Sequence, residues 1–297
     1  TTAQLDGGSK AMLRVTLLRN DGSEITASRM VNVPDYEIVD GTYIVYSANG
    51  LYEWARSHSK CILANDITLP DAAEGGSNWT PVELYTFDGL GHTISNVVIN
   101  GGDYVGFFGR TSGTIKDLNL ANAKINGNNY VGGIIGESRG MHIIACSVTN
   151  CTITGNDNVG GIRGKHFGGD MTACCVTGGT ITGNTNVGGI TGHQHTGAIT
   201  SCYTTADVKG NSSTGSFLGY QFITGIYAGY WQTDTQTNAI GNNEDGYDET
   251  TKVEGGVTWK TATEAMNAAI PTDGTCPYRY VQSDGENNPP AIEKTGE

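Results

Sequence analysis

One glycine-rich segment recurs along the middle of the chain. The copies read YVGFFG, YVGGIIG, NVGGIRG, NVGGITG and the degenerate TGSFLG, at 104–109, 130–136, 158–164, 186–192 and 214–219. Their lead positions, from Val105 to Thr214, recur at a spacing of roughly 26 to 28 residues. Self-similarity at a period of roughly 20 to 50 residues is typical of solenoids, propellers and repeat arrays. The repeat therefore limits the possible folds more than any other feature of the chain.

The register of the repeat extends beyond the glycine-rich segment. The same spacing connects two further columns: Ile115, Ile143, Met171 and Ile199 form one, and Leu118, Cys146, Cys174 and Cys202 form the other. Apolar and polar positions alternate around these columns, which is the period of a strand with one buried face. Each copy therefore predicts about three short strands between Gly and Asn turns. A single copy cannot bury its apolar row, but stacked copies can, as in a parallel β-helix.

We therefore expect an all-β fold, a right-handed parallel β-helix with coils of about 26–28 residues over 43–230. Residues 1–42 predict a β-hairpin that caps the solenoid or ends a preceding domain, with its turn at Asn20-Asp21-Gly22. A short helix is expected at 51–57. Residues 231–297 predict a C-terminal cap, whose helix at 259–270 would form a lid over the end of the solenoid.

Charge and hydropathy exclude several classes of function. The 297 residues include 17 Lys and Arg against 30 Asp and Glu, and the net charge of −13 disfavours binding to nucleic acids and anionic lipids. No apolar run approaches the ~18 residues that cross a bilayer, so no membrane insertion is expected. The chain begins at Thr1 without a recognisable signal peptide, and we expect a signal or anchor segment to lie outside this sequence.

The NVGGITG-type segments, each followed by a Cys and a second apolar segment, resemble the GLUG-motif repeat. The upstream stretches LYEWA, ILANDITLP and FDGLGHTISNVVI are similar to the usual lead-in of such proteins. The resemblance covers about residues 43–270. It implies a bacterial protein that is secreted or at the cell surface and acts as a non-enzymatic adhesion module without a cofactor. The implied partners are glycans or surface proteins of the host or of neighbouring cells, and a stalk without any ligand is an alternative.

One position of the repeat changes its chemistry from coil to coil and is a candidate binding corner. It follows the last Gly of each copy, with further charged residues close by. The candidate residues are Arg110, Glu137, Arg139, Arg163, Lys165, His166, His193, His195 and Tyr220. Candidates for stacking on sugars are Trp79, Tyr85, Tyr220, Phe222, Tyr227, Tyr230 and Trp231. The alternatives are loop decoration for the corner and ordinary core packing for the aromatic residues.

The main alternative function is that of a carbohydrate-active enzyme, a polysaccharide lyase or glycosidase with its site at an end cap. Glycosidases place two carboxylates across the scissile bond. The acids within 104–219 fall in different columns, and none aligns with a second acid one rung away. They are Asp117, Glu137, Asp157, Asp170 and Asp207. No catalytic residue is therefore predicted.

Metal and redox sites are not expected either. His193 and His195 form a His-x-His pair, but no carboxylate or thiolate lies at ligand spacing. The acidic stretch 241–249 is a conceivable Ca²⁺ loop, but it lacks the spacing of an EF-hand and rather predicts a solvated loop. The column that contains three Cys begins with a Leu, so it predicts a ladder of free, buried thiols.

Overall fold

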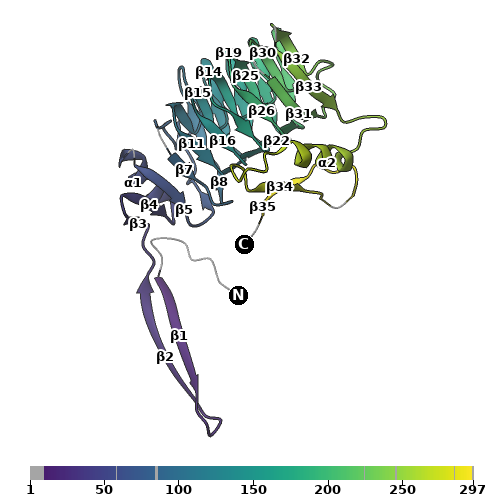
Figure 1. Ribbon diagram of the computed structural model, residues 1–297. Helices are drawn as coiled ribbons and strands as arrows, with labels where there is room; N and C mark the ends of the chain where they lie inside the picture. Colours follow the sequence, from purple (N-terminus) through teal and green to yellow (C-terminus); the bar gives the residue numbers. More distant parts are fainter. Residues whose placement is uncertain are drawn as a thin grey trace.

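The computed structural model describes residues 10–57, 59–83, 86–223, 225–244, 246–283 and 285–295. It is a stack of parallel β-coils, with a long hairpin projecting from one end and a helix-containing segment along one side (Figure 1). The parallel β-helix, the N-terminal hairpin and the C-terminal helix expected from the sequence are all confirmed.

Within the described residues, four sheets run along the solenoid, and we name each by its number of strands. The six-stranded sheet contains β10 (Phe108–Thr111), β15 (Ile135–Arg139), β20 (Arg163–Phe167), β25 (Thr191–Gln194), β30 (Leu218–Gln221) and β32 (Ile240–Asn243). The four-stranded sheet contains β14 (Asn129–Gly132), β19 (Asp157–Gly160), β24 (Thr185–Gly188) and β29 (Ser212–Gly215). The five-stranded sheet contains β9 (Val98–Asn100), β13 (Lys124–Asn126), β18 (Thr152–Thr154), β23 (Thr180–Thr182) and β28 (Asp207–Lys209).

The sixteen-stranded sheet consists of two rows that meet at β31 (Gly225–Trp231). One row contains β3 (Tyr36–Val39), β4 (Thr42–Val45), β5 (Lys60–Leu63), β7 (Thr86–Asp88), β11 (Thr114–Lys116), β16 (His142–Ile144), β21 (Met171–Thr172) and β26 (Ala198–Thr200). The other contains β6 (Ile67–Thr68), β8 (Thr93–Ser95), β12 (Asn119–Ala121), β17 (Ser147–Thr149), β22 (Cys175–Thr177) and β27 (Tyr203–Thr204). The last strand, β33 (Tyr247–Lys252), also pairs with β31.

A regular coil contributes five short strands, such as β15 to β19, and not the three that the alternation pattern predicts. The reason is that each coil has more corners than the alternation pattern reveals. Ala145 and Asn150 adopt positive φ angles of 53° and separate β16, β17 and β18, which otherwise form one continuous pattern. A left-handed Asn is common at turns, whereas a left-handed Ala carries no sequence signal.

Residues one repeat length apart lie on adjacent rungs of the solenoid. Ile115 pairs with Ile143, and Ile143 pairs with Met171, all with fully buried side chains. The column of Cys146, Cys174 and Cys202 is likewise fully buried, with free thiols, so the predicted core ladder is confirmed. Burial of each large aliphatic side chain contributes about 1.5–3 kcal/mol, and the stacked columns therefore hold the coils together.

Helix α1 (Ala48–Ser57) closes the N-terminal end of this core and confirms the short helix expected at 51–57. Its Trp54 side chain is buried and packs against Phe87 and Phe108, with ring centroids 5.2 and 6.3 Å apart. The hairpin of β1 (Lys10–Leu18) and β2 (Glu24–Asn32) extends away from the solenoid instead of covering it (Figure 1). The helix, and not the hairpin, is thus the N-terminal cap.

Helix α2 (Trp259–Ala269) and the strand pair β34 (Tyr278–Val281) and β35 (Ala291–Lys294) lie along the side of the sixteen-stranded sheet (Figure 1). The expected lid over the solenoid end is therefore wrong in its position. Outward-facing residues of the coils, among them Cys175 and Tyr203, form a second apolar cluster that Trp259 and Met266 bury. The Tyr280 hydroxyl donates a hydrogen bond to the Ser201 carbonyl oxygen at 2.7 Å and fastens this segment to the coils.

The six-stranded and four-stranded sheets approach each other so closely that only glycine fits between them. A Cβ atom on Gly192 would lie 2.5 Å from backbone atoms of Asn158 and Val159. Gly164, one coil earlier, meets the backbone at Tyr130 in the same way. The last Gly of four of the five repeat copies, Gly136, Gly164, Gly192 and Gly219, is therefore required by direct backbone contact between two sheets.

The substitution Gly192→Ala should lower the free energy of unfolding by roughly 1–3 kcal/mol, because the added methyl group can be accommodated only by separating the sheets. The measurement is the midpoint of urea unfolding followed by circular dichroism. Gly102→Ala is the matched control, since its Cβ would have no atom within 4 Å. Equal midpoints for the two variants would contradict the close approach.

Candidate functional site

The register of the six-stranded sheet brings most of the predicted corner residues onto one surface. Rungs lie about 4.8 Å apart, so side chains in one column contact their neighbours. The first column contains Arg110, Glu137, Lys165, His193 and Tyr220. A second column, two residues further along each coil, contains Arg139, Phe167, His195 and Phe222. We call these nine residues the corner row.

Glu137 organises one end of the corner row. Its Oε1 atom lies 3.1 Å from Arg110 Nε and 2.8 Å from Arg139 Nε, although the Glu137 side chain is only 4% exposed. The Arg110 guanidinium also lies 4.0 Å above the ring of Tyr104, which stacks on Tyr130 at a centroid distance of 4.8 Å. Two arginines share one carboxylate, so this end of the row has a net positive charge. Their side chains are 43% and 62% exposed.

Aromatic rings dominate the rest of the row, with Lys165 as its cation. The ammonium group of Lys165 lies 4.7 Å from the centre of the Phe167 ring and 5.5 Å from that of Tyr130. Phe167, His195 and Phe222 then follow with centroid distances of 5.3 and 4.8 Å. Sequence reasoning missed Phe167 as a member of the row. The signal was present, since Phe167 lies one repeat length before His195.

His193 contributes hydrogen bonding rather than charge. Burial, and to a lesser extent the nearby Lys165 ammonium, lower the pKa of His193 to about 4, so its imidazole is neutral near pH 7. Its Nδ1 atom lies 3.2 Å from Asn158 Oδ1, and its ring lies 4.6 Å from that of Tyr220. The permanent positive charge of the row therefore comes from its arginines and its lysine.

Arg163 is not part of this surface, and its assignment to the binding corner is corrected. The side chain points into the solenoid, in the same column as Ile135 and Leu218, and has no exposed surface. Its Nε donates to Thr191 Oγ1 at 3.2 Å and its Nη2 to Gln194 Oε1 at 2.6 Å, whereas Nη1 has no partner among the described residues. Burial lowers the pKa of Arg163 to about 9.

His166 also faces the interior and is corrected in the same way. It is fully buried, on the rung between Ser138 and Gln194. Burial, followed by the nearby Arg163 charge, lowers its pKa to about 2, so the imidazole is neutral. Its Nε2 donates to the Gly169 carbonyl oxygen at 2.8 Å, and its Nδ1 accepts from the Ser138 hydroxyl at 2.7 Å. Both residues are therefore structural, because the position of the backbone in the coil, and not the polarity of the side chain, decides which side it faces.

The predicted sugar-stacking residues separate into different environments. Tyr220 and Phe222 belong to the corner row, and Tyr227 is exposed near the end of the solenoid. Trp79 and Trp231 are buried and have no open ring face. Tyr230 is partly buried beside α2, and Tyr85 lies outside the described residues.

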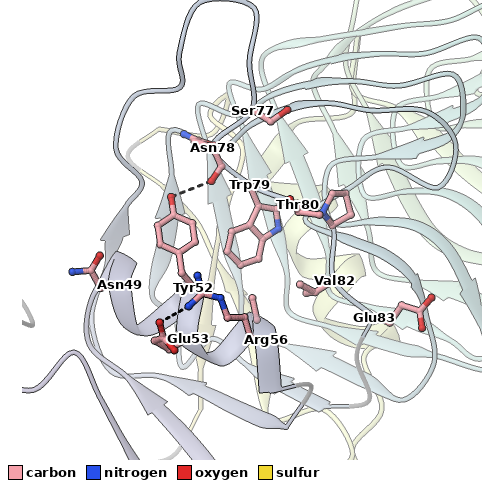
Figure 2. A pocket seen from close by; sticks show the side chains of 12 residues that line it. Asn49, Tyr52, Glu53, Arg56, Ser77, Asn78, Trp79, Thr80, Val82 and Glu83 are labelled. Carbon is pink, nitrogen blue, oxygen red and sulfur yellow. Dashed lines mark hydrogen bonds and ion pairs between the residues drawn. The ribbon is translucent and has the colours of Figure 1, made fainter.

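A groove of about 650 Å³ lies at the N-terminal end, between α1 and residues 77–83 (Figure 2). Tyr52 forms part of its wall and donates a hydrogen bond from its hydroxyl to the Asn78 carbonyl oxygen at 3.0 Å. Trp79 behind it stacks on Phe107 at a centroid distance of 4.5 Å. A second contact between lining residues is the ion pair of Glu53 and Arg56.

Two carboxylates lie on adjacent coils beside β11, outside the six-stranded sheet. Asp88 is paired with Lys116 Nζ at 2.7 Å, and Asp117 accepts a hydrogen bond from Tyr278. Burial raises the pKa of Asp117, and the charge of Asp88 adds to this rise. Each carboxylate is already bound by a neighbouring side chain of the fold.

Among the described residues, no three His, Cys, Asp or Glu side chains come together in a way that could hold a metal ion. Asp245, in the acidic stretch 241–249, lies outside those residues. Neither helix in the described part of the chain is long and apolar enough to span a membrane.

Comparison with known proteins identifies the repeat. Residues 127–157 match the family model described as the GLUG motif, so the resemblance seen in the sequence is confirmed. The chain is also 34% identical over 144 residues to halomucin of Haloquadratum walsbyi. The match covers 42% of this chain but only 2% of halomucin, so this chain corresponds to a small part of that relative.

A solved structure with partial likeness is that of a putative immunoglobulin A1 protease from Bacteroides ovatus. The two chains are 16% identical, and the superposition covers 77% of this chain and 88% of the other with a TM-score of 0.49.

The substitution His166→Gln should make the free energy of unfolding decrease less as the pH falls. The folded pKa of His166 is about 2, against an ordinary value of 6.5, so the unfolded chain takes up this proton first. The contribution of His166 is therefore complete above about pH 6.5 and is lost as the pH falls towards 2. Gln should be tolerated, because Gln194 and Gln221 occupy the next rungs of the same column.

The measurement is the urea midpoint of the wild type and the variant between about pH 7 and pH 4. His142→Gln serves as a control that removes an exposed imidazole from the neighbouring sheet. A variant with the same pH dependence as the wild type would show that His166 is not held neutral inside the solenoid.

Proposed function

We propose that this protein is a non-enzymatic recognition module at the cell surface or in the secreted fraction, and that its corner row binds acidic glycans. The observation that carries the proposal is the row of rings and cations on a chain whose net charge is −13. Cations above ring faces recognise groups that are both anionic and partly apolar, as carboxylated or sulfated sugars are.

The geometry of the row favours an extended ligand. Its contacts repeat at the rung spacing of about 4.8 Å along a rigid stack of coils, so a polymer lying along the solenoid can meet several rungs at once. The solenoid core keeps these side chains in register without any ligand, which lowers the ordering cost of binding. Linear polysaccharides fit this description better than small molecules that need an enclosed pocket.

Two further observations support the proposal. The match to a small part of halomucin is in keeping with a module of a long secreted or surface chain. Asp88 and Asp117 are two acids on adjacent coils, and Asp88 is engaged by Lys116 and Asp117 by Tyr278. This engagement favours a binding role over the alternative of a carbohydrate-active enzyme.

The double substitution Arg139→Ala and Lys165→Ala should weaken binding to acidic glycans at least about tenfold, because it removes two cations that contact rings. Binding is measured on an array of neutral and acidic glycans, with and without Ca²⁺, and then by titration at two salt concentrations. Added salt should weaken the interaction. Glu137 keeps Arg110 as a partner in this variant, so the fold is preserved.

The matched control is Lys124→Ala with Lys209→Ala, two exposed lysines on the five-stranded sheet. If both double variants bind the glycan equally well, the glycan binds outside the corner row. If no glycan on the array binds selectively, glycan binding is contradicted, and a protein partner or a stalk function takes its place.

A further inference from the structure

Exposed apolar side chains gather at the two ends of this protein. Six lie on the projecting hairpin and are 43% to 73% exposed: Met12, Val15, Leu17, Leu18, Ile25 and Met30. Three lie at the other end of the solenoid: Ile223, Tyr227 and Tyr247. Within the described residues between 91 and 222, no large apolar side chain is exposed to this degree. Four more lie elsewhere: Ile38 and Val39 on β3, Leu90 before β8 and Val281 on β34. Clusters of exposed apolar residues mark interaction sites, and two such clusters are those of the hairpin and of the far end of the solenoid.

The hairpin lacks the support that such an element needs. Strands β1 and β2 pair only with each other in the described part of the chain, so both outer edges are free. An isolated two-stranded hairpin is at best marginally stable in water, and it gains stability when a further strand or a packed face is added. Free edges with apolar side chains are templates for pairing with another chain.

The charge of the hairpin is opposite to that of the remaining chain. Residues 10–32 contain four cations and two acids, which leaves 13 cations and 28 acids for all other residues. Strand β1 itself carries Lys10 and Arg14 and no acid. The hairpin is therefore attracted to an acidic surface.

The far end of the solenoid offers such a surface. Strand β33 pairs with β31 alone among the described residues, so its other edge is open. It carries the exposed acids Asp248 and Glu249, beside the rings of Tyr247 and Tyr227, which lie 5.4 Å apart. This end thus combines an open strand edge, acidic groups and exposed rings. The hairpin presents the complementary set at the opposite end of the molecule (Figure 1).

We infer that copies of this chain associate head to tail, with β1 of one copy added to the open edge of β33 in the next. The cations of β1 are attracted to the acidic end that contains Asp248 and Glu249, and the apolar hairpin residues cover the exposed rings. The contact joins two different surfaces at opposite ends of the molecule, so each copy can bind a further copy at either end and assemblies larger than a dimer result. The corner row lies on another face and takes no part in it, so the inference is independent of glycan binding.

The test is sedimentation velocity at increasing protein concentration, with circular dichroism to check folding. Wild type should form concentration-dependent oligomers that added salt dissociates. Variant A carries Lys10→Glu and Arg14→Glu, and variant B carries Asp248→Lys and Glu249→Lys. Each alone has two ends of like charge, and its dissociation constant should rise at least about tenfold. An equimolar mixture of A and B has complementary ends again, and it should associate as tightly as the wild type.

The control variants reverse charges of the same sign at exposed sites outside β1 and β33. They are Lys124→Glu with Lys209→Glu, and Glu74→Lys with Glu83→Lys. Both should associate like the wild type. A wild type that stays monomeric up to its solubility limit would overturn the inference. So would a mixture of A and B that fails to associate although circular dichroism shows both variants folded, since the mixture again brings ends of opposite charge together.

Discussion

Backbone pairing between coils, repeated at every turn of the solenoid, is the constraint on which the whole structure depends. It places each side chain directly on its counterpart from the previous coil, so every column has one environment along the rod. Inward columns must be apolar or internally hydrogen-bonded, as Ile143 and His166 illustrate. Where two sheets touch through their backbones, the column must be Gly, as at Gly192. The sequence repeat is the consequence of this stacking.

The same stacking separates structure from function. Columns that face the solvent on the six-stranded sheet are free to vary, and their chemistry changes from Arg110 to Glu137 to Lys165 without any change of the backbone. Neighbouring rungs are so close that these variable side chains pair with one another, and Glu137 joins two arginines. The surface of linked cations and rings is thus held by a scaffold whose fold does not depend on the identity of these side chains.

The candidate site could be predicted only in part, because residue type does not reveal the side of a strand. Lys165 and Arg163 are both cations two positions apart, yet one lies at the surface and the other in the core. The glycine between them meets the backbone of the preceding coil, which interrupts simple alternation. The predicted position of the C-terminal helix, as a lid over the end of the solenoid, was wrong for a related reason. The apolar strip with Cys175 and Tyr203 along the side of the coils, which α2 covers, appears only after the coils are stacked.

The sequence by itself determined the parallel β-helix, its period, the buried Cys ladder and the column that holds most of the corner residues. A strict repeat with strand alternation has few other ways to bury its apolar rows. Only the tertiary structure decided which polar residues lie inside, where the C-terminal helix docks and that the hairpin projects without a partner. Those outcomes depend on contacts between distant segments and on corners at residues such as Ala145, whose left-handed backbone no local pattern announces.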